Sequence, residues 1–272
     1  MVMLDILAQN FPESELLIAH FDHGIRKNSN EDAEFVERRA SDYGIETVLG
    51  KGTLGDDASE EEARTARYDF LRKVASEVGG EIYTAHHLDD LVGSVAINLI
   101  RGTGWRGLAV LNTAGIKRPF LEDYTELGFE NPPTKKDLLE YAGKHSLRFR
   151  EDQTNASDEY LRNRLYHQVN NFSQKMAVFV LWQKQVRLRS EIDTLIAEIV
   201  ARETWQRDWF KKMDDAAAIE VLRAELLKKN ISATRPQLRD FLKAIREYAP
   251  GKYFNLPGGI MVRLNKNDFS IN

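Results

Sequence analysis

Apolar and polar positions alternate along the first part of the chain in a way that predicts strands and helices in turn. The elements follow one another as helix 1–8, strand 15–21, helix 31–43, strand 45–49, helix 59–79, strand 82–85 and a helix from residue 88. In the last of these helices Leu91, Val95 and Leu99 recur every fourth position. Strands that alternate with helices predict an α/β fold, a Rossmann-like parallel sheet with helices on both faces.

The pattern changes to helices alone from about residue 170. The sequence there predicts helices at 173–203, 215–229 and 235–247, then a β-hairpin at 252–263 and an edge strand at 269–271. We therefore expect two domains, an α/β domain over residues 1–168 and a smaller, mainly helical domain with a terminal hairpin over residues 169–272.

The composition excludes several classes of protein. The 272 residues include no cysteine, which excludes a disulfide framework, a thiolate zinc site and a cysteine nucleophile. No apolar run approaches the roughly 18 residues that a membrane span needs, and no signal segment opens the chain. The expectation is a cytoplasmic protein with no membrane partner.

Charge is distributed unevenly. Residues 1–160 carry 18 Lys and Arg against 30 Asp and Glu, whereas residues 161–272 carry 20 against 12. The net charges are thus −12 and +8, and together they give the −4 of the whole chain. A basic second half favours contact with a polyanion such as nucleic acid, although solvated charged helices would give the same imbalance.

Polar side chains follow two of the predicted strands. The first strand runs into His20, Asp22 and His23, and the third runs into His86, His87, Asp89 and Asp90. Ligands of open α/β sheets gather at the carboxyl ends of strands, and a helix N-terminus attracts phosphate. Carboxylates also suit the first turn of a helix for structural reasons alone. Between these strands, Arg64 and Arg67 lie three apart on one helix face, where they would hold a phosphate or pair with nearby Glu residues.

Six segments together resemble one enzyme family. They are AHFDHGIR (19–26), EEARTARYDFL (61–71), AHHLDD (85–90), NLIRGTGWRGLA (98–109), KRPFL (117–121) and EDQTNASDEYLRNRLYHQV (151–169). In order and spacing they are similar to the tRNA(Ile)-lysidine synthetases, which are PP-loop ATP pyrophosphatases of the N-type. The resemblance covers about residues 1–170, and the last segment is its most specific part.

The resemblance implies a reaction and its partners. The family uses ATP and Mg²⁺ to adenylate the C2 oxygen of the wobble cytidine in an isoleucine tRNA with a CAU anticodon. The ε-amine of free L-lysine then attacks C2, and AMP leaves. A homodimer is also expected.

The resemblance further implies roles for individual residues. Asp89, Asp90 and Arg64 would be catalytic, and the two aspartates would bind the metal or an ammonium group. The ATP-binding residues would be Ala19, His20, Phe21, His23, Arg67, His86, Arg101 and Gly102. The tRNA backbone would contact Arg162, Asn163 and Arg164.

Two features depart from the family pattern. The phosphate-binding motif SGGxDS and the strand before it are absent from the sequence, although the family places them directly before the helix that begins here at Met1. We therefore expect about 25 to 30 further N-terminal residues in the natural protein. After the two aspartates the family has Gln-x-Glu-Thr, whereas this chain has Leu91-Val92-Gly93-Ser94, so Gly93 leaves the identity of the amine open.

Two alternatives remain at this stage. One is a metal-dependent hydrolase that uses the histidines and aspartates at residues 20, 23, 86, 87, 89 and 90, although adjacent histidines point apart and do not easily share one ion. The other is a catalytically inactive RNA-binding relative, which would agree with the missing motif, Gly93 and the basic second half.

Overall fold

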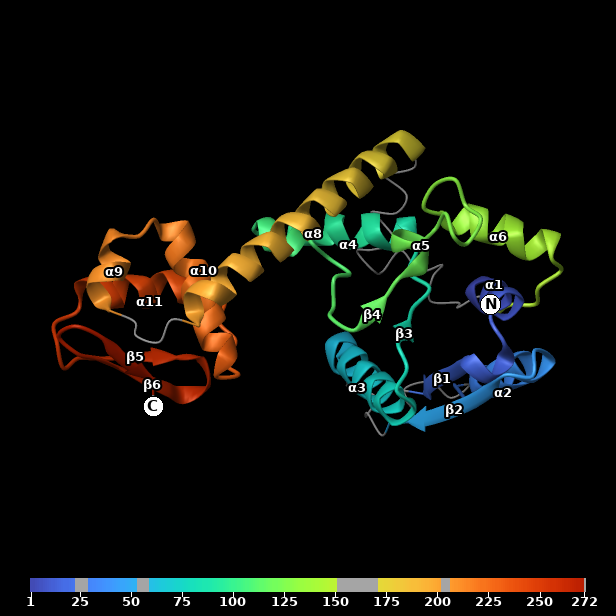
Figure 1. Ribbon diagram of the computed structural model, residues 1–272, viewed down its shortest axis with the longest axis horizontal. Coiled ribbons are helices and arrows are strands. Elements are labelled where there is room, and N and C mark those ends of the chain that lie inside the picture. Colours follow the sequence, from blue (N-terminus) through green and yellow to red (C-terminus); the bar gives the residue numbers. More distant parts are fainter. Residues whose placement is uncertain (23–28, 53–58, 151–170, 202–205, 272) are drawn as a thin grey trace. The chain divides into compact units, whose positions relative to one another are not determined.

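The computed structural model describes residues 1–22, 29–52, 59–150, 171–201 and 206–271 (Figure 1). The chain divides into two compact units, Met1–Val186 and Arg187–Asn272. The boundary falls inside helix α8, which runs from Phe172 to Val200.

The first unit contains two pairs of parallel strands. Strand β1 (Leu17–Asp22) pairs with β2 (Glu46–Lys51), and β3 (Ile82–Tyr83) pairs with β4 (Ile116–Lys117). Among the described residues no strand is hydrogen-bonded to both pairs. The parallel strands and their helices confirm the expected Rossmann-like α/β class. Strand β4 was not predicted, because two residues give no readable pattern.

Helices cover these strands. The helices of this unit are α1 (Val2–Asn10), α2 (Ser29–Asp42), α3 (Glu60–Val78), α4 (Leu88–Ile100), α5 (Pro119–Glu122), α6 (Lys135–Lys144) and the first part of α8, with short 3-10 turns η1 (Glu13–Glu15) and η2 (Trp105–Leu108). Helix α3 contacts both β1 and β3. Its start is fixed by a capping box, in which the Glu62 N–H donates to Ser59 Oγ and the Ser59 N–H donates to Glu62.

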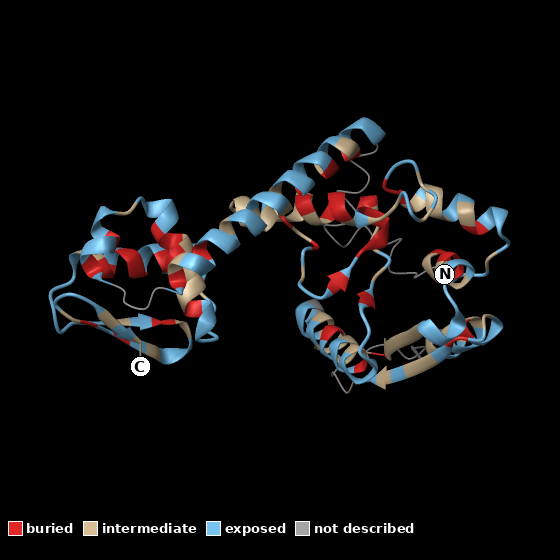
Figure 2. Ribbon diagram, viewed as in Figure 1, coloured by how far each residue is buried: buried red, intermediate tan, exposed pale blue. Residues whose placement is uncertain are grey.

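Helix α4 carries the main hydrophobic contacts of this unit (Figure 2). Leu91 and Val95 are buried and belong to one cluster with Phe179 and Trp182 of α8. The Trp182 indole N–H donates to the carbonyl of Val110 at 2.7 Å, so its polar group is hydrogen-bonded while its ring packs in this cluster. Leu99, the third residue of the predicted apolar pattern, is 55% exposed. The buried face of α4 therefore ends one turn before the pattern does.

A single carboxylate joins three helical regions of the first unit. Asp5 of α1 is buried and accepts hydrogen bonds from the hydroxyls of Tyr43, at 2.6 Å, and Tyr141, at 2.8 Å. Gln9 donates a third hydrogen bond, to Asp5 Oδ2. Burial and the hydrogen bond to Asp5 raise the pKa of Tyr43 and that of Tyr141 to about 12. Asp5 therefore fixes α1 against the end of α2 and against α6.

The second unit packs helices on a small antiparallel sheet. Its further elements are α9 (Arg207–Lys212), α10 (Asp215–Lys228), α11 (Arg235–Glu247), β5 (Tyr253–Leu256), η4 (Pro257–Gly259), β6 (Ile260–Leu264) and β7 (Phe269–Ile271). The strands lie in the order β5-β6-β7, which confirms the expected hairpin and edge strand. Phe210, Phe241 and Val262 lie fully buried between helices and sheet.

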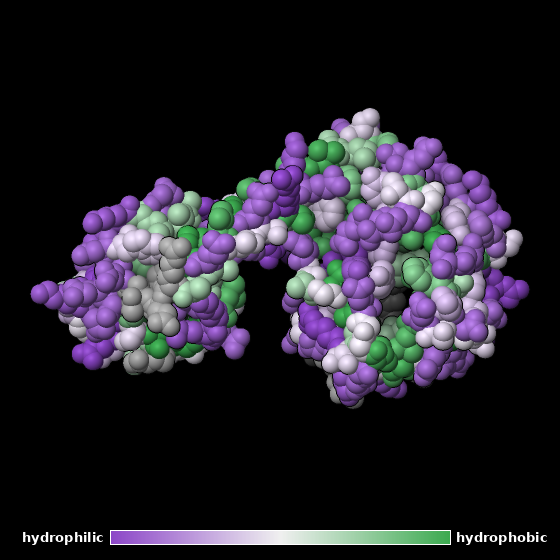
Figure 3. Space-filling view, in the orientation of Figure 1, coloured by the Kyte–Doolittle hydropathy of each residue, from purple (hydrophilic) through white to green (hydrophobic). Residues whose placement is uncertain are grey.

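The surface is largely polar. Hydrophilic residues cover most of the visible face of each unit, with smaller apolar areas between them (Figure 3). In the described parts of the chain, no helix combines the length and the apolar character that crossing a membrane requires.

Candidate functional site

The turn from β3 into α4 places the His-His-x-Asp-Asp segment at a helix start, as expected. Its second aspartate, Asp90, serves the helix itself. The backbone N–H of His87 donates to Asp90 Oδ2 at 3.0 Å, and the His87 ring nitrogen Nε2 lies 3.4 Å from the same oxygen. Asp90 thus caps the first turn of α4 and faces the two histidines.

The first aspartate, Asp89, contacts residues of α8 and α6. Its side chain is only 2% exposed, and Lys175 of α8 places its ammonium 2.6 Å from Oδ1. Oδ2 accepts the backbone N–H of Lys135 at 2.7 Å. Both oxygens are therefore bound, and Asp89 holds an ammonium group.

This arrangement does not fit the expected Mg²⁺ ion at Asp89, because the ion would have to displace Lys175. The described residues contain no group of three or more His, Cys, Asp and Glu side chains that could hold a metal. Of the six residues of the hydrolase alternative, His23 lies outside the described part of the chain. The metal role of Asp89 and Asp90 stays a prediction.

A positively charged cluster surrounds His86. Strands β3 and β4 are parallel neighbours, so their carboxyl ends bring His86 and Arg118 to the same edge. Burial, opposed by the charge of Asp90 and aided by the charges of Arg118, Arg67 and Arg64, lowers the pKa of His86 to about 4. The imidazole is therefore neutral near pH 7. It lies with its Nδ1 atom 3.0 Å from the Thr84 hydroxyl.

Helix α3 brings Arg64 and Arg67 to this cluster. Their guanidinium carbons lie 5.5 and 5.3 Å from the ring centroid of the buried Tyr68 on the same helix. Such stacking on an aromatic face keeps the charges in place without neutralising them. Three arginines near one neutral histidine give this edge a positive charge of the kind that attracts anions, and the phosphate-binding role expected for Arg64 and Arg67 stays a prediction.

The end of β1 is joined to the same helix. Phe21 packs against Phe70 of α3, with ring centroids 5.4 Å apart. Gly50 of β2 leaves room for this contact, because a Cβ atom there would lie only 2.5 Å from Phe70 and 2.8 Å from Phe21. Ala19 and His20 precede Phe21 on β1 and are partly buried. Their role in binding ATP is untested.

Other expected site residues lie elsewhere. Arg101 and Gly102 are exposed and end α4, about 20 Å along the helix axis from Asp89. Gly102 has a φ of +69°, which is a structural reason for glycine at a helix end. His23, and the expected tRNA-binding residues Arg162, Asn163 and Arg164, lie outside the described residues.

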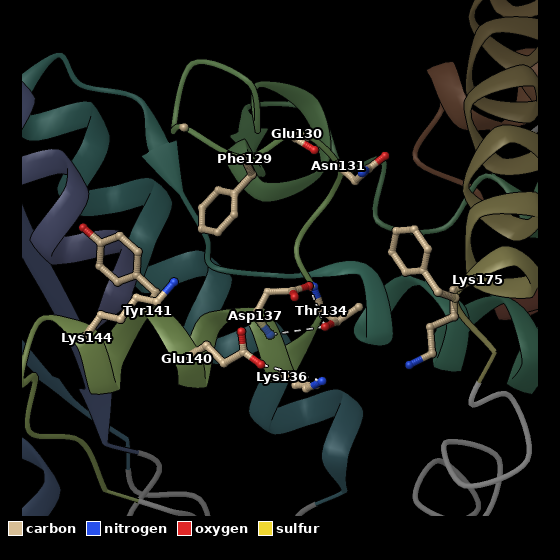
Figure 4. Close-up of a pocket in the computed structure, with 12 residues that line it drawn as sticks. Phe129, Glu130, Asn131, Thr134, Lys136, Asp137, Glu140, Tyr141, Lys144 and Lys175 are labelled. Atoms are coloured by element: carbon tan, nitrogen blue, oxygen red, sulfur yellow. Dashed lines mark hydrogen bonds and ion pairs between the residues drawn. The ribbon is translucent and has the colours of Figure 1, made fainter.

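A cavity of about 680 Å³ lies beside Lys175 (Figure 4). Its lining comes from the loop before α6, from α6 and from the start of α8: Gly128, Phe129, Glu130, Asn131, Thr134, Lys136, Asp137, Glu140, Tyr141, Lys144, Phe172 and Lys175. Asp137 is engaged in the capping box of Thr134, and Glu140 lies 3.7 Å from Lys136. Glu130 and Lys144 line the same cavity. The mixture of carboxylates, ammonium groups and aromatic rings suits a small zwitterion.

Sequence reasoning missed two residues of the site. Lys175 is 86 positions from Asp89, and no local pattern announces their contact. Arg118 lies in the KRPFL segment, which the resemblance included without giving Arg118 a role. The available signal was a cation at the end of a strand, but the strand is too short to recognise.

Comparison with known proteins places this site in a family. Residues 1–172 match the family described as the PP-loop domain. The chain belongs to the PP-loop family. This confirms the resemblance stated from the sequence.

Relatives of this PP-loop chain include tRNA(Ile)-lysidine synthases. The enzyme of Thermotoga maritima is 32% identical over 222 residues, which are 75% of this chain and 51% of the relative. The bifunctional protein TilS/HprT of Listeria monocytogenes is 28% identical over 251 residues, or 88% of this chain and 34% of the relative. The PP-loop chain thus spans about half or less of the length of these relatives.

A solved structure shares the fold. The U34-tRNA thiolase NcsA from Methanococcus maripaludis superimposes with a TM-score of 0.53 at 19% identity, over 69% of the PP-loop chain and 67% of the thiolase. At this level of identity the likeness concerns the fold alone.

Proposed function

We propose that this PP-loop chain carries out the chemistry of a tRNA(Ile)-lysidine synthase. The observation that supports it most is the similarity of 75% of its length, at 32% identity, to a protein of that name from Thermotoga maritima. The arginine cluster at the carboxyl ends of β3 and β4 adds a site of the right charge for the phosphates of ATP.

The reaction that we propose has two steps. The C2 oxygen of the wobble cytidine attacks the α-phosphorus of ATP, and pyrophosphate leaves. The ε-amine of lysine then attacks C2, the C2–O bond breaks and AMP departs with that oxygen. The chain must therefore hold a polyphosphate, present the cytidine and bind a lysine whose amine gives up a proton.

Arg64 and Arg67 would hold the phosphates, because a guanidinium matches phosphate oxygens with two parallel hydrogen bonds. The neutral His86 would accept or donate one hydrogen bond to the nucleotide without adding a further positive charge. Lysine would bind in the cavity beside Lys175, where Glu130 offers a carboxylate to an ammonium and Lys144 offers an ammonium to the carboxylate. Residues 169–272 and the Arg162–Arg164 segment would contact the tRNA.

The test uses the protein expressed from its natural gene, with ATP, Mg²⁺, radiolabelled lysine and a transcript of isoleucine tRNA bearing the CAU anticodon. We expect stoichiometric labelling of the tRNA. A transcript with uridine at the wobble position is the matched control, and it should stay unlabelled because it lacks the cytidine.

Three outcomes decide the proposal. Labelling that requires the wobble cytidine supports it. Tight tRNA binding without labelling would instead identify a relative that binds RNA and has no activity. Labelling by another amino acid in place of lysine would support the ligase chemistry and reject lysine as the amine. Other amino acids are tested because Gly93 replaces the glutamate that the family has at this position.

A further inference from the structure

Arg118 is the most deeply buried charged side chain in the described part of the chain, at 1% exposure. It lies directly after β4 and precedes α5, whose first residue is Pro119. Its Nη1 atom donates to the carbonyl of Ile116 at 3.1 Å, but its buried Nε and Nη2 atoms have no hydrogen-bond partner. Buried donors without partners are costly, so such a residue calls for a reason.

The two unpartnered atoms have a shared geometry. Nε and Nη2 form one edge of the planar guanidinium, and this edge donates two parallel hydrogen bonds to a single carboxylate or phosphate. The nearest acid of its own segment does not use it, because Glu122 accepts the backbone N–H of Arg118 at 3.0 Å. The guanidinium is therefore anchored on one side by the Ile116 carbonyl, and its other edge is buried with its two donors unused.

The surroundings of this edge are also cationic. The buried hydroxyl of Tyr68 makes no hydrogen bond of full geometry, although it lies close enough to the Arg118 guanidinium to raise its pKa. Arg64 and Arg67 lie over the same tyrosine ring. Burial lowers the pKa of Arg118 and the nearby Arg64 lowers it too, while Tyr68 and Glu122 oppose the shift. An anion entering here would meet three guanidinium groups and one hydroxyl donor.

We propose that the Nε–Nη2 edge of Arg118 binds one phosphate group of the nucleoside triphosphate, and that the Tyr68 hydroxyl donates to the same group. This assignment rests on the proposed function, and it adds Arg118 and Tyr68 to the residues expected from the sequence. The depth of Arg118 selects a small polyphosphate over an RNA backbone, whose sugars and bases could not follow the phosphate to a side chain that is 1% exposed.

The test compares Arg118→Met and Arg118→Lys with Arg72→Met, a matched control. Arg72 lies on α3, also faces the Tyr68 ring at 6.0 Å and is half exposed in an ion pair with Asp69. Affinity for inorganic pyrophosphate and for ATP is measured by calorimetry on the full protein without tRNA. Thermal unfolding without ligand is measured in parallel.

We expect Arg118→Met to weaken pyrophosphate and ATP binding by about 10- to 100-fold, the effect of losing two charged hydrogen bonds. Its melting temperature without ligand should stay equal or rise, because a buried, partly unpaired charge is removed. Arg118→Lys should bind pyrophosphate and ATP little better than Arg118→Met, since an ammonium cannot donate two parallel hydrogen bonds to one phosphate. Arg72→Met should bind like the wild type. Should Arg118→Met fail to fold, Tyr68→Phe serves instead, with an expected loss of several-fold in affinity.

Contrary results are equally specific. A lower melting temperature with unchanged pyrophosphate affinity would make Arg118 a structural residue. Weakened tRNA binding with unchanged pyrophosphate affinity would assign the edge to RNA. A wild type that binds neither pyrophosphate nor ATP would also overturn the assignment. Pyrophosphate binding that depends on Arg118, in a protein that does not transfer lysine, would support this inference and reject the proposed function. Normal lysine transfer by Arg118→Met would support the proposed function and reject this inference.

Discussion

At the scale of single residues, the pairing of Asp89 with Lys175 changes what the His-His-x-Asp-Asp segment can do. Two aspartates next to each other in sequence suggest a shared metal or substrate. In the folded chain they diverge, since Asp90 caps α4 and Asp89 binds the ammonium of a lysine from α8. The buried pair therefore joins two helices that are far apart in sequence.

Removing one partner of this pair should be costly. We expect Lys175→Met to lower the free energy of unfolding by about 3 to 5 kcal/mol, because Asp89 is left as a buried charge. Urea unfolding followed by circular dichroism measures this. Lys184→Met, which alters an exposed lysine of the same helix, should change stability by less than about 0.5 kcal/mol. A loss of under about 1 kcal/mol for Lys175→Met would mean that Asp89 is not held by this lysine.

His86 should make stability depend on pH. Its pKa is lowered to about 4 in the folded chain, chiefly by burial, from an ordinary value near 6.5. Between these values the unfolded chain binds a proton that the folded chain does not, so stability falls as the pH drops from about 6.5 to about 4. The whole effect is at most about 3 kcal/mol.

The measurement is urea unfolding at pH 7, 6, 5 and 4 for the wild type and His86→Asn. We expect the stability of His86→Asn to decline less steeply below pH 6.5. Substitution of the exposed His145 by asparagine is the control. Parallel pH profiles for the wild type and His86→Asn would show that His86 does not titrate as stated.

At the scale of elements, the sequence predicted those parts of the fold that local chemistry determines. The helix expected from residue 59 begins with a capping box, in which Ser59 exchanges reciprocal hydrogen bonds with the third residue of α3. Strand β4 shows the limit. It pairs with β3 over two residues, too few for a period of two to be read, although its carboxyl end carries Arg118.

The same limit applies to the site. His86, Arg64 and Arg67 were expected together because each lies in a readable element, and the structure brings them together. Arg118 and Lys175 act through contacts between distant segments, which only the assembled fold reveals. Arg101 was assigned by resemblance alone, and helix geometry separates it from the start of α4.

At the scale of the whole molecule, the division of charge predicts how nucleic acid is bound. The residues after 160 carry a net +8, including Arg162 and Arg164. We expect the logarithm of the tRNA association constant to fall linearly with the logarithm of salt concentration, because bound phosphates release counterions. Replacing both arginines by glutamine should reduce the magnitude of the slope by about 1.5.

Filter binding or fluorescence anisotropy between about 50 and 200 mM salt gives these slopes. Changing two exposed lysines of the first unit, Lys73 and Lys136, to glutamine is the matched control and should leave the slope unchanged. Affinity that does not vary with salt would show that the basic half does not contact the RNA backbone.

Asp5 has a consequence for how this protein can change over evolution. Its carboxylate satisfies the hydroxyls of Tyr43 and Tyr141, which lie 38 and 136 positions away in sequence. Loss of either tyrosine leaves the buried carboxylate short of a donor, and loss of Asp5 leaves two partly buried hydroxyls short of an acceptor. In an alignment of relatives, positions 5, 43 and 141 should therefore covary, so that lineages keep all three residues or replace them as a set.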